Sequence, residues 1–377
     1  MVDTPAQPLV VVAAGGTGGH LFPAEALAVA LGKRGVTVDL ATDERAVHYG
    51  HDFPARETHI IPSATLRTRN VASLLPASWR LIRGAFVADR AFGRLKPAAV
   101  IGFGGYPTIP PLLAAAFRRI PTLIHEQNGV MGKANKLLAP LVRAIATSLP
   151  GVVDRDPKLA AKATHTGNPV RPAVIEAAKM AYAAPGRPGP LNLLVFGGSQ
   201  GARIMADIVP PAVELLPVGV RANLVVTQQA RGEDTDRVRA TYERLGVKAE
   251  IAPFFSDLPA RIAQSQLVVS RSGASTVAEL AAIGRPAILV PLPHALDQDQ
   301  LANARVLEKA GGAIRIDQSV FTPEKLADEI AGIAVAPERL AAMAERARAA
   351  GALDAADRLA ELVLRVAGLK AERVETT

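Results

Sequence analysis

The chain has 377 residues, of which 49% are apolar and 21% charged, so it is long enough for two domains with sizeable cores. It contains no cysteine, which excludes disulfides and cysteine-ligated metal sites, and its start lacks the basic and apolar regions of a signal peptide. Residues 1–170 hold 19 Lys and Arg against 11 Asp and Glu, which accounts for the whole net charge of +8 and predicts an anionic partner for the first half.

The first half of the sequence alternates runs that are typical of strands and of helices. The predicted strands are 9–13, 36–41, 100–102 and 122–125, and the predicted helices are 23–34 and 131–139. This alternation predicts an α/β domain with a parallel, doubly wound sheet. The run 167–172, Gly-Asn-Pro-Val-Arg-Pro, interrupts the pattern and is predicted to be the linker between two domains.

The alternation resumes after this linker, which predicts a second domain of the same class. Residues 176–190 are rich in Ala, Pro and Gly and are predicted to form a loose surface loop. The helical tail at about 346–369 is expected to pack back on the first domain, so that the domains are 1–168 and 169–345. The predicted strands are 191–196, 222–227, 249–252, 267–270 and 287–290, and the predicted helices are 203–216, 236–245, 276–283, 298–310 and the tail 337–369.

Three glycine-rich turns each follow a predicted strand, at 15–20 (Gly-Gly-Thr-Gly-Gly-His), 102–106 (Gly-Phe-Gly-Gly-Tyr) and 197–201 (Gly-Gly-Ser-Gln-Gly). A strand that runs into glycines and then a helix presents backbone N–H groups that suit phosphates. A tight turn alone also explains any one of them, and the first matches neither the dinucleotide fingerprint nor the Walker loop. Together they predict two α/β domains that face each other across a phosphate-binding cleft.

Polar residues beside these turns and at other strand ends are candidates for the chemistry. His20 begins a helix beside the first turn, where it acts either as a general base or as a helix cap. The run 125–128, His-Glu-Gln-Asn, follows a strand where side chains usually line a crevice. Glu279 either binds a ribose or faces the positive end of its helix, and Asp299 and Gln300 suit sugar hydroxyls or N-capping. No spacing of His or carboxylates predicts a metal site.

Residues 62–96 combine apolar side chains, including the single Trp of the chain, with seven Arg and Lys against one acid, Asp89. An apolar patch ringed by cations is typical of a segment at a membrane surface. The alternative is an ordinary amphipathic helix with a solvated basic face, and the charge imbalance favours the membrane interpretation. The residues expected to contact the membrane are Leu75, Trp79, Arg80, Arg83 and Phe86.

Taken together and in order, these motifs resemble the MurG family of N-acetylglucosaminyltransferases, which are GT-B enzymes of glycosyltransferase family 28. The resemblance runs from about residue 9 to about residue 310 and includes the linker. It implies two Rossmann-like domains around a central cleft. It also implies inverting, metal-independent transfer of N-acetylglucosamine from UDP-N-acetylglucosamine to lipid I, undecaprenyl-pyrophosphoryl-N-acetylmuramyl-pentapeptide. The product would be lipid II for peptidoglycan synthesis, with no cofactor.

The resemblance also implies roles for individual residues. His20 is the candidate base that removes a proton from the acceptor hydroxyl, with Glu126 as the alternative. The implied donor contacts include Phe255, whose backbone would read uracil, and Glu279, which would bind the ribose. The donor-binding residues are Thr17, Gly18, Gly19, Asn128, Arg171, Ser199, Gln200, Phe255, Ala274, Glu279 and Gln300. The acceptor-binding residues are Gly15, Gly16, Gly104, Gly105 and Tyr106.

The partners implied by this resemblance are UDP-N-acetylglucosamine, lipid I, an anionic membrane surface and other proteins of cell-wall synthesis. The protein would lie peripherally on the cytoplasmic face of the inner membrane. A UDP-N-acetylglucosamine 2-epimerase, or another GT-B enzyme of UDP-sugars, would share the architecture, but an epimerase needs no lipid-binding segment. A nucleic-acid-binding protein would use the basic first half, but the chain lacks the aromatic platforms of single-strand binders, so no nucleic acid is expected.

Overall fold

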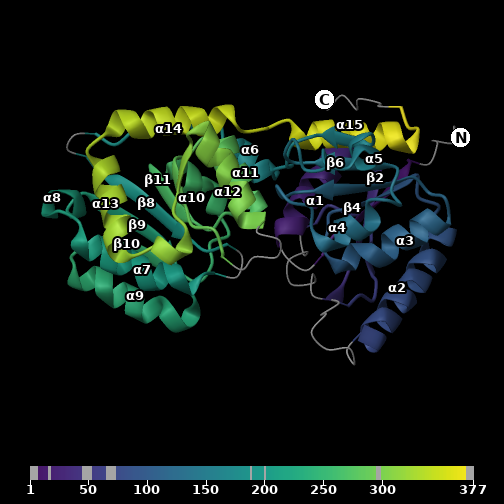
Figure 1. Cartoon of the computed structure of the whole chain (residues 1–377), viewed down its shortest axis with the longest axis horizontal. Coiled ribbons are helices and arrows are strands. Elements are labelled where there is room, and N and C mark those ends of the chain that lie inside the picture. Colours follow the sequence, from purple (N-terminus) through teal and green to yellow (C-terminus); the bar gives the residue numbers. More distant parts are fainter. Residues whose placement is uncertain are drawn as a thin grey trace, which may run out of the picture. The chain divides into compact units, whose positions relative to one another are not determined.

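The computed structural model describes residues 7–15, 18–44, 53–64, 74–186, 189–198, 201–293 and 299–370. The chain divides into two compact units, one formed by Met1–Arg171 with Asp354–Thr377 and the other by Pro172–Leu353 (Figure 1). The division falls within the predicted linker. The second unit extends to Leu353 rather than to residue 345, so that the helix ending near residue 349 belongs to it.

The first unit contains a seven-stranded sheet, within the described ranges, in the order β3-β2-β1-β4-β5-β6-β7. All of its neighbouring strands are parallel. The chain winds outward from β1 to β3 and then returns to β4 on the other side of β1, which is the Rossmann winding order. The strands are β1 (Leu9–Ala13), β2 (Thr37–Thr42), β3 (Thr58–Ile60), β4 (Ala99–Gly102), β5 (Thr122–Glu126), β6 (Ala144–Thr147) and β7 (Ala163–His165).

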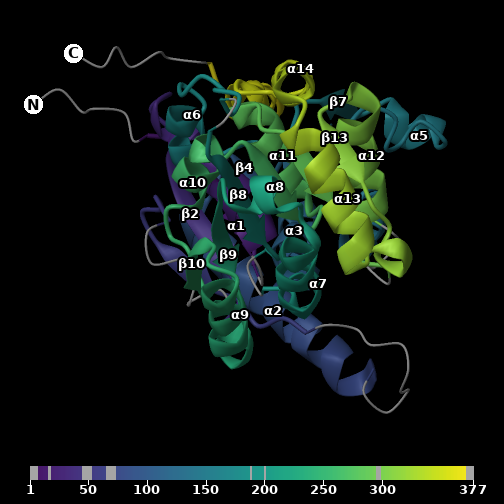
Figure 2. The same cartoon turned by 90° about the vertical axis from the view of Figure 1, so that its left-hand side faces the viewer.

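Side chains of β1 alternate between two cores on the two faces of this sheet. Val10 and Val12 pack with α1 and α15, whereas Val11 and Ala13 pack with α2, α3 and α4. The C-terminal helix α15 therefore covers one face (Figure 1), and α2 lies beside α3 on the other (Figures 1 and 2). The helices are α1 (Gly18–Gly32), α2 (Leu74–Leu95), η3 (Tyr106–Thr108), α3 (Ile109–Phe117), α4 (Lys133–Leu138), α5 (Pro157–Ala160) and α15 (Ala355–Ala367).

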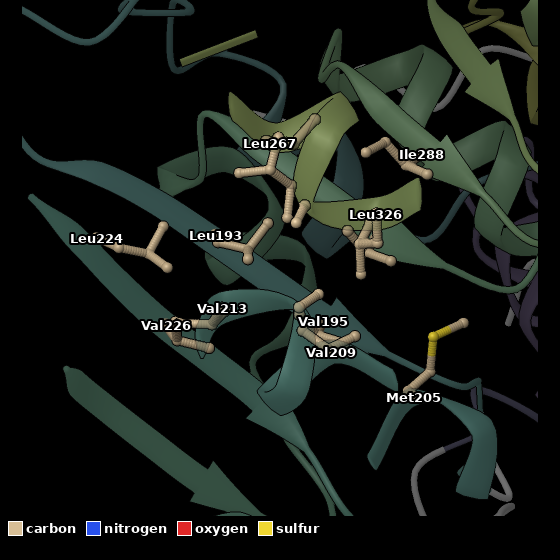
Figure 3. Packing of buried hydrophobic residues seen from close by; sticks show 14 of the residues in the cluster. Leu193, Val195, Met205, Val209, Val213, Leu224, Val226, Leu267, Ile288 and Leu326 are labelled. Carbon is tan, nitrogen blue, oxygen red and sulfur yellow. The ribbon is translucent and has the colours of Figure 1, made fainter. Parts of the chain in front are cut away.

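The second unit repeats the same winding order in a six-stranded parallel sheet, again within the described ranges, β10-β9-β8-β11-β12-β13. On one face Leu193 and Val195 of β8 pack with Val209 of α7 and Leu326 of α13 (Figure 3). The strands are β8 (Leu191–Phe196), β9 (Leu224–Gln229), β10 (Lys248–Ala252), β11 (Leu267–Ser270), β12 (Ala287–Leu289) and β13 (Ala313–Arg315). The helices are α6 (Pro172–Ala177), α7 (Arg203–Leu215), α8 (Val218–Arg221), α9 (Gly232–Arg244), α10 (Leu258–Gln264), α11 (Ala274–Ile283), α12 (Asp299–Ala310), η5 (Gln318–Val320), α13 (Pro323–Ala334) and α14 (Pro337–Ala349).

The predicted fold class, two Rossmann-like α/β domains, is confirmed. The ends of several elements differ from the prediction: α1 begins at Gly18 rather than at residue 23, and α4 covers only Lys133–Leu138. The sequence does not predict β3, β6, β7 and β13. These strands have three or four residues each, too few to show a period, and β6 is half alanine, a residue depleted in strands.

The surface loop predicted at 176–190 is present in its described part after α6, which is mostly exposed and has no helix or strand, but it is anchored rather than loose. Arg285 is only 1% exposed, and its guanidinium donates to the carbonyl of Met180 at 3.0 Å. The hydroxyl of Tyr182 donates to the carbonyl of Gln266 at 3.1 Å. Burial lowers the pKa of Arg285 to about 10, so the guanidinium stays charged at neutral pH and holds the Met180 carbonyl strongly.

Candidate active site

The first two glycine turns meet at the point where the winding order of the first sheet reverses. Gly15 follows β1 and Gly104 follows β4, and these two strands are neighbours. A Cβ atom on Gly15 would lie 3.0 Å from Cβ of Pro107, which follows the second turn directly. Ligands of open parallel sheets bind at this kind of crevice, at the carboxyl ends of the strands. Gly16 and Thr17 lie outside the described residues.

His20 lies in the first turn of α1, with its imidazole against the second glycine turn. A Cβ atom on Gly104 would lie 3.3 Å from Cε1 of His20, and one on Gly105 would lie 3.6 Å from Nε2. Both glycines have positive φ angles, +84° and +76°. Their backbone conformation therefore favours glycine, and the candidate base lies beside the predicted acceptor turn.

The carboxylate of Glu126 is buried at the end of β5, where only 1% of the residue is exposed. Its Oε1 accepts hydrogen bonds from the backbone N–H of Asn128 at 3.0 Å and from the Asn128 amide at 3.1 Å. Its Oε2 accepts from the backbone N–H of Gly132 at 2.9 Å and from Nδ2 of Asn135 at 2.8 Å. The alternative base is thus enclosed by its own loop, and no sequence motif marks Asn135 as one of its partners.

His125, one residue earlier, is a structural histidine. Its Nε2 lies 3.1 Å from the carbonyl of Gly167 and its Nδ1 lies 3.0 Å from the amide nitrogen of Gln127. The amide nitrogen of Gln127 can only donate, so Nδ1 of His125 accepts and its Nε2–H donates to the Gly167 carbonyl. Burial lowers the pKa of His125 to about 4, so the ring is neutral and ties β5 to the start of the linker.

Arg171, expected to bind the donor diphosphate, is anchored on α1. Its guanidinium carbon lies 3.8 Å from the ring centroid of Phe22. A Cβ atom on Gly18 would lie 2.9 Å from Cζ of the same ring. Phe22 therefore links the guanidinium to the first glycine turn through a cation–π contact. No sequence motif marks Phe22 beyond its place near the predicted start of a helix.

In the second sheet, β8 and β11 are the neighbours between which the winding order reverses. The third glycine turn follows β8, and a Cβ atom on Gly197 would lie 2.1 Å from the backbone nitrogen of Ala202. Gln229 accepts from the N–H of Gly197 at 3.0 Å and donates to the carbonyl of Pro253 at 3.1 Å. Gln229 was not predicted, and it joins the turn to the segment that carries Phe255. Ser199 and Gln200 lie outside the described residues.

Ala274 begins α11 directly after β11, and Glu279, 5% exposed, lies further along the same helix. The hydroxyl of Ser272 donates to the carbonyl of Gln300 at 2.8 Å. Gln300 Oε1 in turn accepts from the N–H of Leu292 at 3.1 Å. The structure therefore brings together the starts of α11 and α12, which the sequence presents as separate candidate sites.

Two further residues complete the surroundings of this second site. Arg271 donates to the carbonyls of Val290 and Pro291 at 3.0 and 3.3 Å, and so holds the segment after β12. Phe255 is only 7% exposed, and the guanidinium of Arg261 lies 4.2 Å from its ring centroid. The side chain of Phe255 is therefore buried, with its ring against the guanidinium of Arg261.

Helix α2 exposes apolar and basic side chains together. Trp79 is 67% and Phe86 68% exposed, and Arg80 and Arg83 are exposed with them. Asp89, the one acid of the segment, forms an ion pair with Arg118, which directly follows α3. The distance from Arg118 Nε to Asp89 Oδ1 is 2.6 Å. Leu75 lies in the part of α2 whose side chains are not described. Within the described residues, no helix has both the length and the apolar character needed to cross a membrane.

One cluster of the described residues has metal-ligand geometry. Single ligand atoms of Asp39, Glu57 and His59 lie within 4.8 Å of one another. Arg56, however, donates to both oxygens of Asp39, at 2.9 and 2.6 Å. The Asp39 carboxylate is therefore held by an arginine fork, and the cluster, formed by β2 and residues 56–59 at the start of β3, is better described as an ion-pair network than as a metal site.

Two Rossmann-like units, each with glycine turns where its winding order reverses, define an α/β protein of the nucleotide-binding type. Residues 10–147 match the N-terminal domain of glycosyltransferase family 28, and residues 192–359 match the C-terminal domain of the same family. The chain belongs to glycosyltransferase family 28.

Relatives support this membership over almost the whole chain. A protein of Rhodopseudomonas palustris (strain HaA2) is 62% identical over 96% of this chain and 99% of its own length. One of Bradyrhizobium sp. (strain BTAi1) is 60% identical over 97% and 100%. Both are named UDP-N-acetylglucosamine–N-acetylmuramyl-(pentapeptide) pyrophosphoryl-undecaprenol N-acetylglucosamine transferase.

Solved structures give the same fold. The crystal structure of Acinetobacter baumannii MurG is 29% identical, with a TM-score of 0.76, and covers 95% of this chain and 99% of its own. A UDP-N-acetylglucosamine 2-epimerase of Neisseria meningitidis, solved with UDP-N-acetylglucosamine, has a TM-score of 0.67 but only 12% identity over 95% and 100% of the two chains. The second likeness concerns the fold alone.

Proposed function

We propose that this protein transfers N-acetylglucosamine from UDP-N-acetylglucosamine to pyrophosphoryl-undecaprenol-linked N-acetylmuramyl-pentapeptide, lipid I, to give lipid II. The observation that carries the proposal is the identity of 62% over 96% of the chain with a relative named for this reaction. Glycine turns at both switch points support it, because donor and acceptor each carry a diphosphate.

Most of the proposed donor contacts belong to the second unit, and Asn128 and Arg171 of the first unit are proposed as further donor contacts. Glu279 would accept hydrogen bonds from the ribose hydroxyls, and the backbone at Phe255 would bind uracil. The Ala274 backbone and the Gln300 amide would contact the sugar, with Asn128 as a further contact. Arg171, Ser199 and the third turn would hold the diphosphate, so that protein donors rather than a metal stabilise the leaving UDP.

The first unit is proposed to bind the acceptor diphosphate at its two glycine turns. Inversion requires one direct attack by the acceptor hydroxyl on the anomeric carbon, with loss of the hydroxyl proton as the bond forms. His20 is proposed as the base, and its position beside Gly104 and Gly105 supports this role.

Helix α2 is proposed to hold the protein peripherally on the cytoplasmic face of the inner membrane. Exposed Trp79 and Phe86 would enter the headgroup region while Arg80 and Arg83 attract anionic lipids. This location suits an enzyme whose acceptor carries an undecaprenyl chain. Because of this proposed membrane location, other proteins of cell-wall synthesis are also proposed as partners.

The proposed reaction is tested by transfer of radiolabelled N-acetylglucosamine from its UDP donor to a short-chain lipid I analogue. The expected product is labelled disaccharide-lipid, formed only when both substrates are present. Glu329→Gln, on α13, changes a residue that is not among the proposed site residues, and it is expected to remain active. Label that moves into UDP-N-acetylmannosamine without acceptor would instead establish the epimerase.

A further inference from the structure

The carboxylate of Glu126 is saturated with hydrogen-bond donors. Each carboxylate oxygen of Glu126 accepts hydrogen bonds from two donors, at distances between 2.8 and 3.1 Å, and the residue is 1% exposed. An ionised carboxylate offers about four lone-pair positions, and all four are used here. These bonds involve a charged acceptor and are therefore stronger than ordinary amide hydrogen bonds.

These four donors belong to the two ends of one loop. Asn128 lies at its start, and Gly132 and Asn135 lie at its end, where α4 begins. The backbone carbonyl of Glu126 also accepts from the N–H of Ser148 at 2.9 Å, which fixes the residue itself in the sheet. One buried charge thus closes the loop 127–132 onto the end of β5.

Hydrogen bonds to the same carboxylate set the orientation of two side-chain amides, those of Asn128 and Asn135. Nδ2 of Asn135 donates to Glu126 Oε2 and also lies 3.2 Å from the carbonyl of His125. A reversed amide would place its oxygen against two acceptors, so this orientation is the stable one. A Cβ atom on Gly104 would lie 3.5 Å from the same Nδ2, which puts the oriented amide beside the second glycine turn.

We infer that Glu126 is a positioning residue, which holds Asn128, Asn135 and the loop between them, and that it does not take the proton of the acceptor hydroxyl. A general base must reach the proton with a free lone pair. Protonation of Glu126 would instead turn one acceptor oxygen into a donor that faces N–H groups. The inference rests on the proposed transferase function, and it leaves His20 as the candidate base.

The loop itself supplies a test that does not depend on activity. Lys133 and Lys136 follow the loop on the short helix α4, and both are exposed. Glu126→Gln places an amide NH₂ against donors, so trypsin is expected to cut after these lysines about tenfold faster than in the wild type, the scale of one lost charged hydrogen bond. Asn135→Ala keeps the carboxylate and is expected to open the loop as well, whereas His20→Ala is expected to leave it closed.

Kinetics separate positioning from proton transfer. For a positioning residue, Glu126→Gln and Asn135→Ala both raise KM for the sugar nucleotide or the acceptor about tenfold, and the remaining activity keeps the acid limb of the wild-type pH profile. In a protein that already carries Asn128→Ala, the further change Glu126→Gln raises KM much less than Glu126→Gln does by itself. The reason is that both substitutions act through the Glu126 carboxylate. Affinity for UDP alone stays within about twofold of the wild type and reports that the variants are folded.

A Glu126→Gln variant that stays closed to trypsin, keeps its KM, loses about 10²–10⁴ in kcat and loses the acid limb would make Glu126 the base and overturn the inference. Wild-type values in every measurement would overturn it too. If Glu126→Gln fails to bind UDP, Asn135→Ala decides, since it leaves the carboxylate in place. Failure of the wild type to make lipid-linked product would refute the transferase proposal, whereas the trypsin result would stand by itself.

Discussion

The guanidinium of Arg171 lies 3.8 Å from the ring centroid of Phe22. Arg171 is the last residue of the first compact unit before the chain enters the second, and Phe22 belongs to the first turns of α1. An arginine stacked on an aromatic ring has lost part of its rotational freedom before any ligand binds. The residue proposed to hold the diphosphate is thereby oriented in advance.

Replacing the stacking ring is expected to weaken nucleotide binding. A cation–π contact of this kind contributes about 0.5–2 kcal/mol, so Phe22→Leu should raise the Kd for UDP about two- to thirtyfold. Calorimetric titration with UDP measures this. Phe117→Leu makes the same change on an 85% exposed ring of α3 and should leave the Kd unchanged. Equal affinity of both variants would remove Phe22 from the donor site.

Glu279 is expected to carry much of the specificity for the ribose. A buried, charge-assisted hydrogen bond contributes roughly 1.5–3 kcal/mol, so Glu279→Ala should weaken UDP binding about ten- to a hundredfold. Glu329→Ala on α13 is the control for loss of one carboxylate. Thermal unfolding of both variants shows whether the fold is kept. An unchanged Kd for UDP would refute the role of Glu279.

His20→Ala is expected to affect the chemical step. General-base catalysis is worth about 10²–10⁴ in rate, so kcat should fall by that factor. UDP affinity should stay nearly intact, because the proposed nucleotide contacts belong to other residues. Steady-state kinetics with the lipid I analogue and titration with UDP measure the two effects separately. Retention of more than about a tenth of kcat would rule out His20 as the base.

The membrane proposal predicts a charge effect on vesicle binding. Each Arg near an anionic surface contributes about 1 kcal/mol, so reversing Arg80 and Arg83 to Glu should weaken binding to phosphatidylglycerol vesicles by about thirtyfold or more. Arg339→Glu with Lys325→Glu gives the same change of net charge in the second unit. Co-sedimentation of both double variants at low and physiological salt makes the comparison. Equal binding would leave α2 as an ordinary amphipathic helix.

Stability should depend on pH through His125. Its folded-state pKa of about 4 is below the unfolded value of about 6.5, so only the unfolded chain binds a proton between these two values. The contribution of His125 to the free energy of unfolding is therefore complete above about pH 6.5. The free energy of unfolding then falls by up to about 3 kcal/mol as the pH drops towards 4.

Urea unfolding of wild type and His125→Asn at pH 7 and pH 4.5 checks this expectation. The variant should be less stable at pH 7, because it loses the contact with the Gly167 carbonyl, but it should lose less stability on acidification. His165→Asn, on the partly buried β7, is the control. A wild-type pH dependence in His125→Asn would assign the effect to other groups.

Local patterns in the sequence are sufficient for the elements that surround the site. The glycine turns, the alternation of strands and helices and the exposed position of Trp79 depend on residues close together in the chain, and such short-range patterns survive without tertiary information. Short strands such as β6, with two alanines among four residues, carry no comparable signal and were found only in the sheet.

Residue patterns along the chain are enough to predict two Rossmann-like domains with glycine turns after their strands, because periodicity and glycine conformation are local properties. Three relationships appear only in the folded chain: the first two turns meet at one switch point, Phe22 supports Arg171, and the carboxylate of Glu126 is enclosed by its own loop. Those relationships depend on strand order and on the direction of individual side chains. Both are set by packing between residues distant in the chain, and no local spacing encodes them.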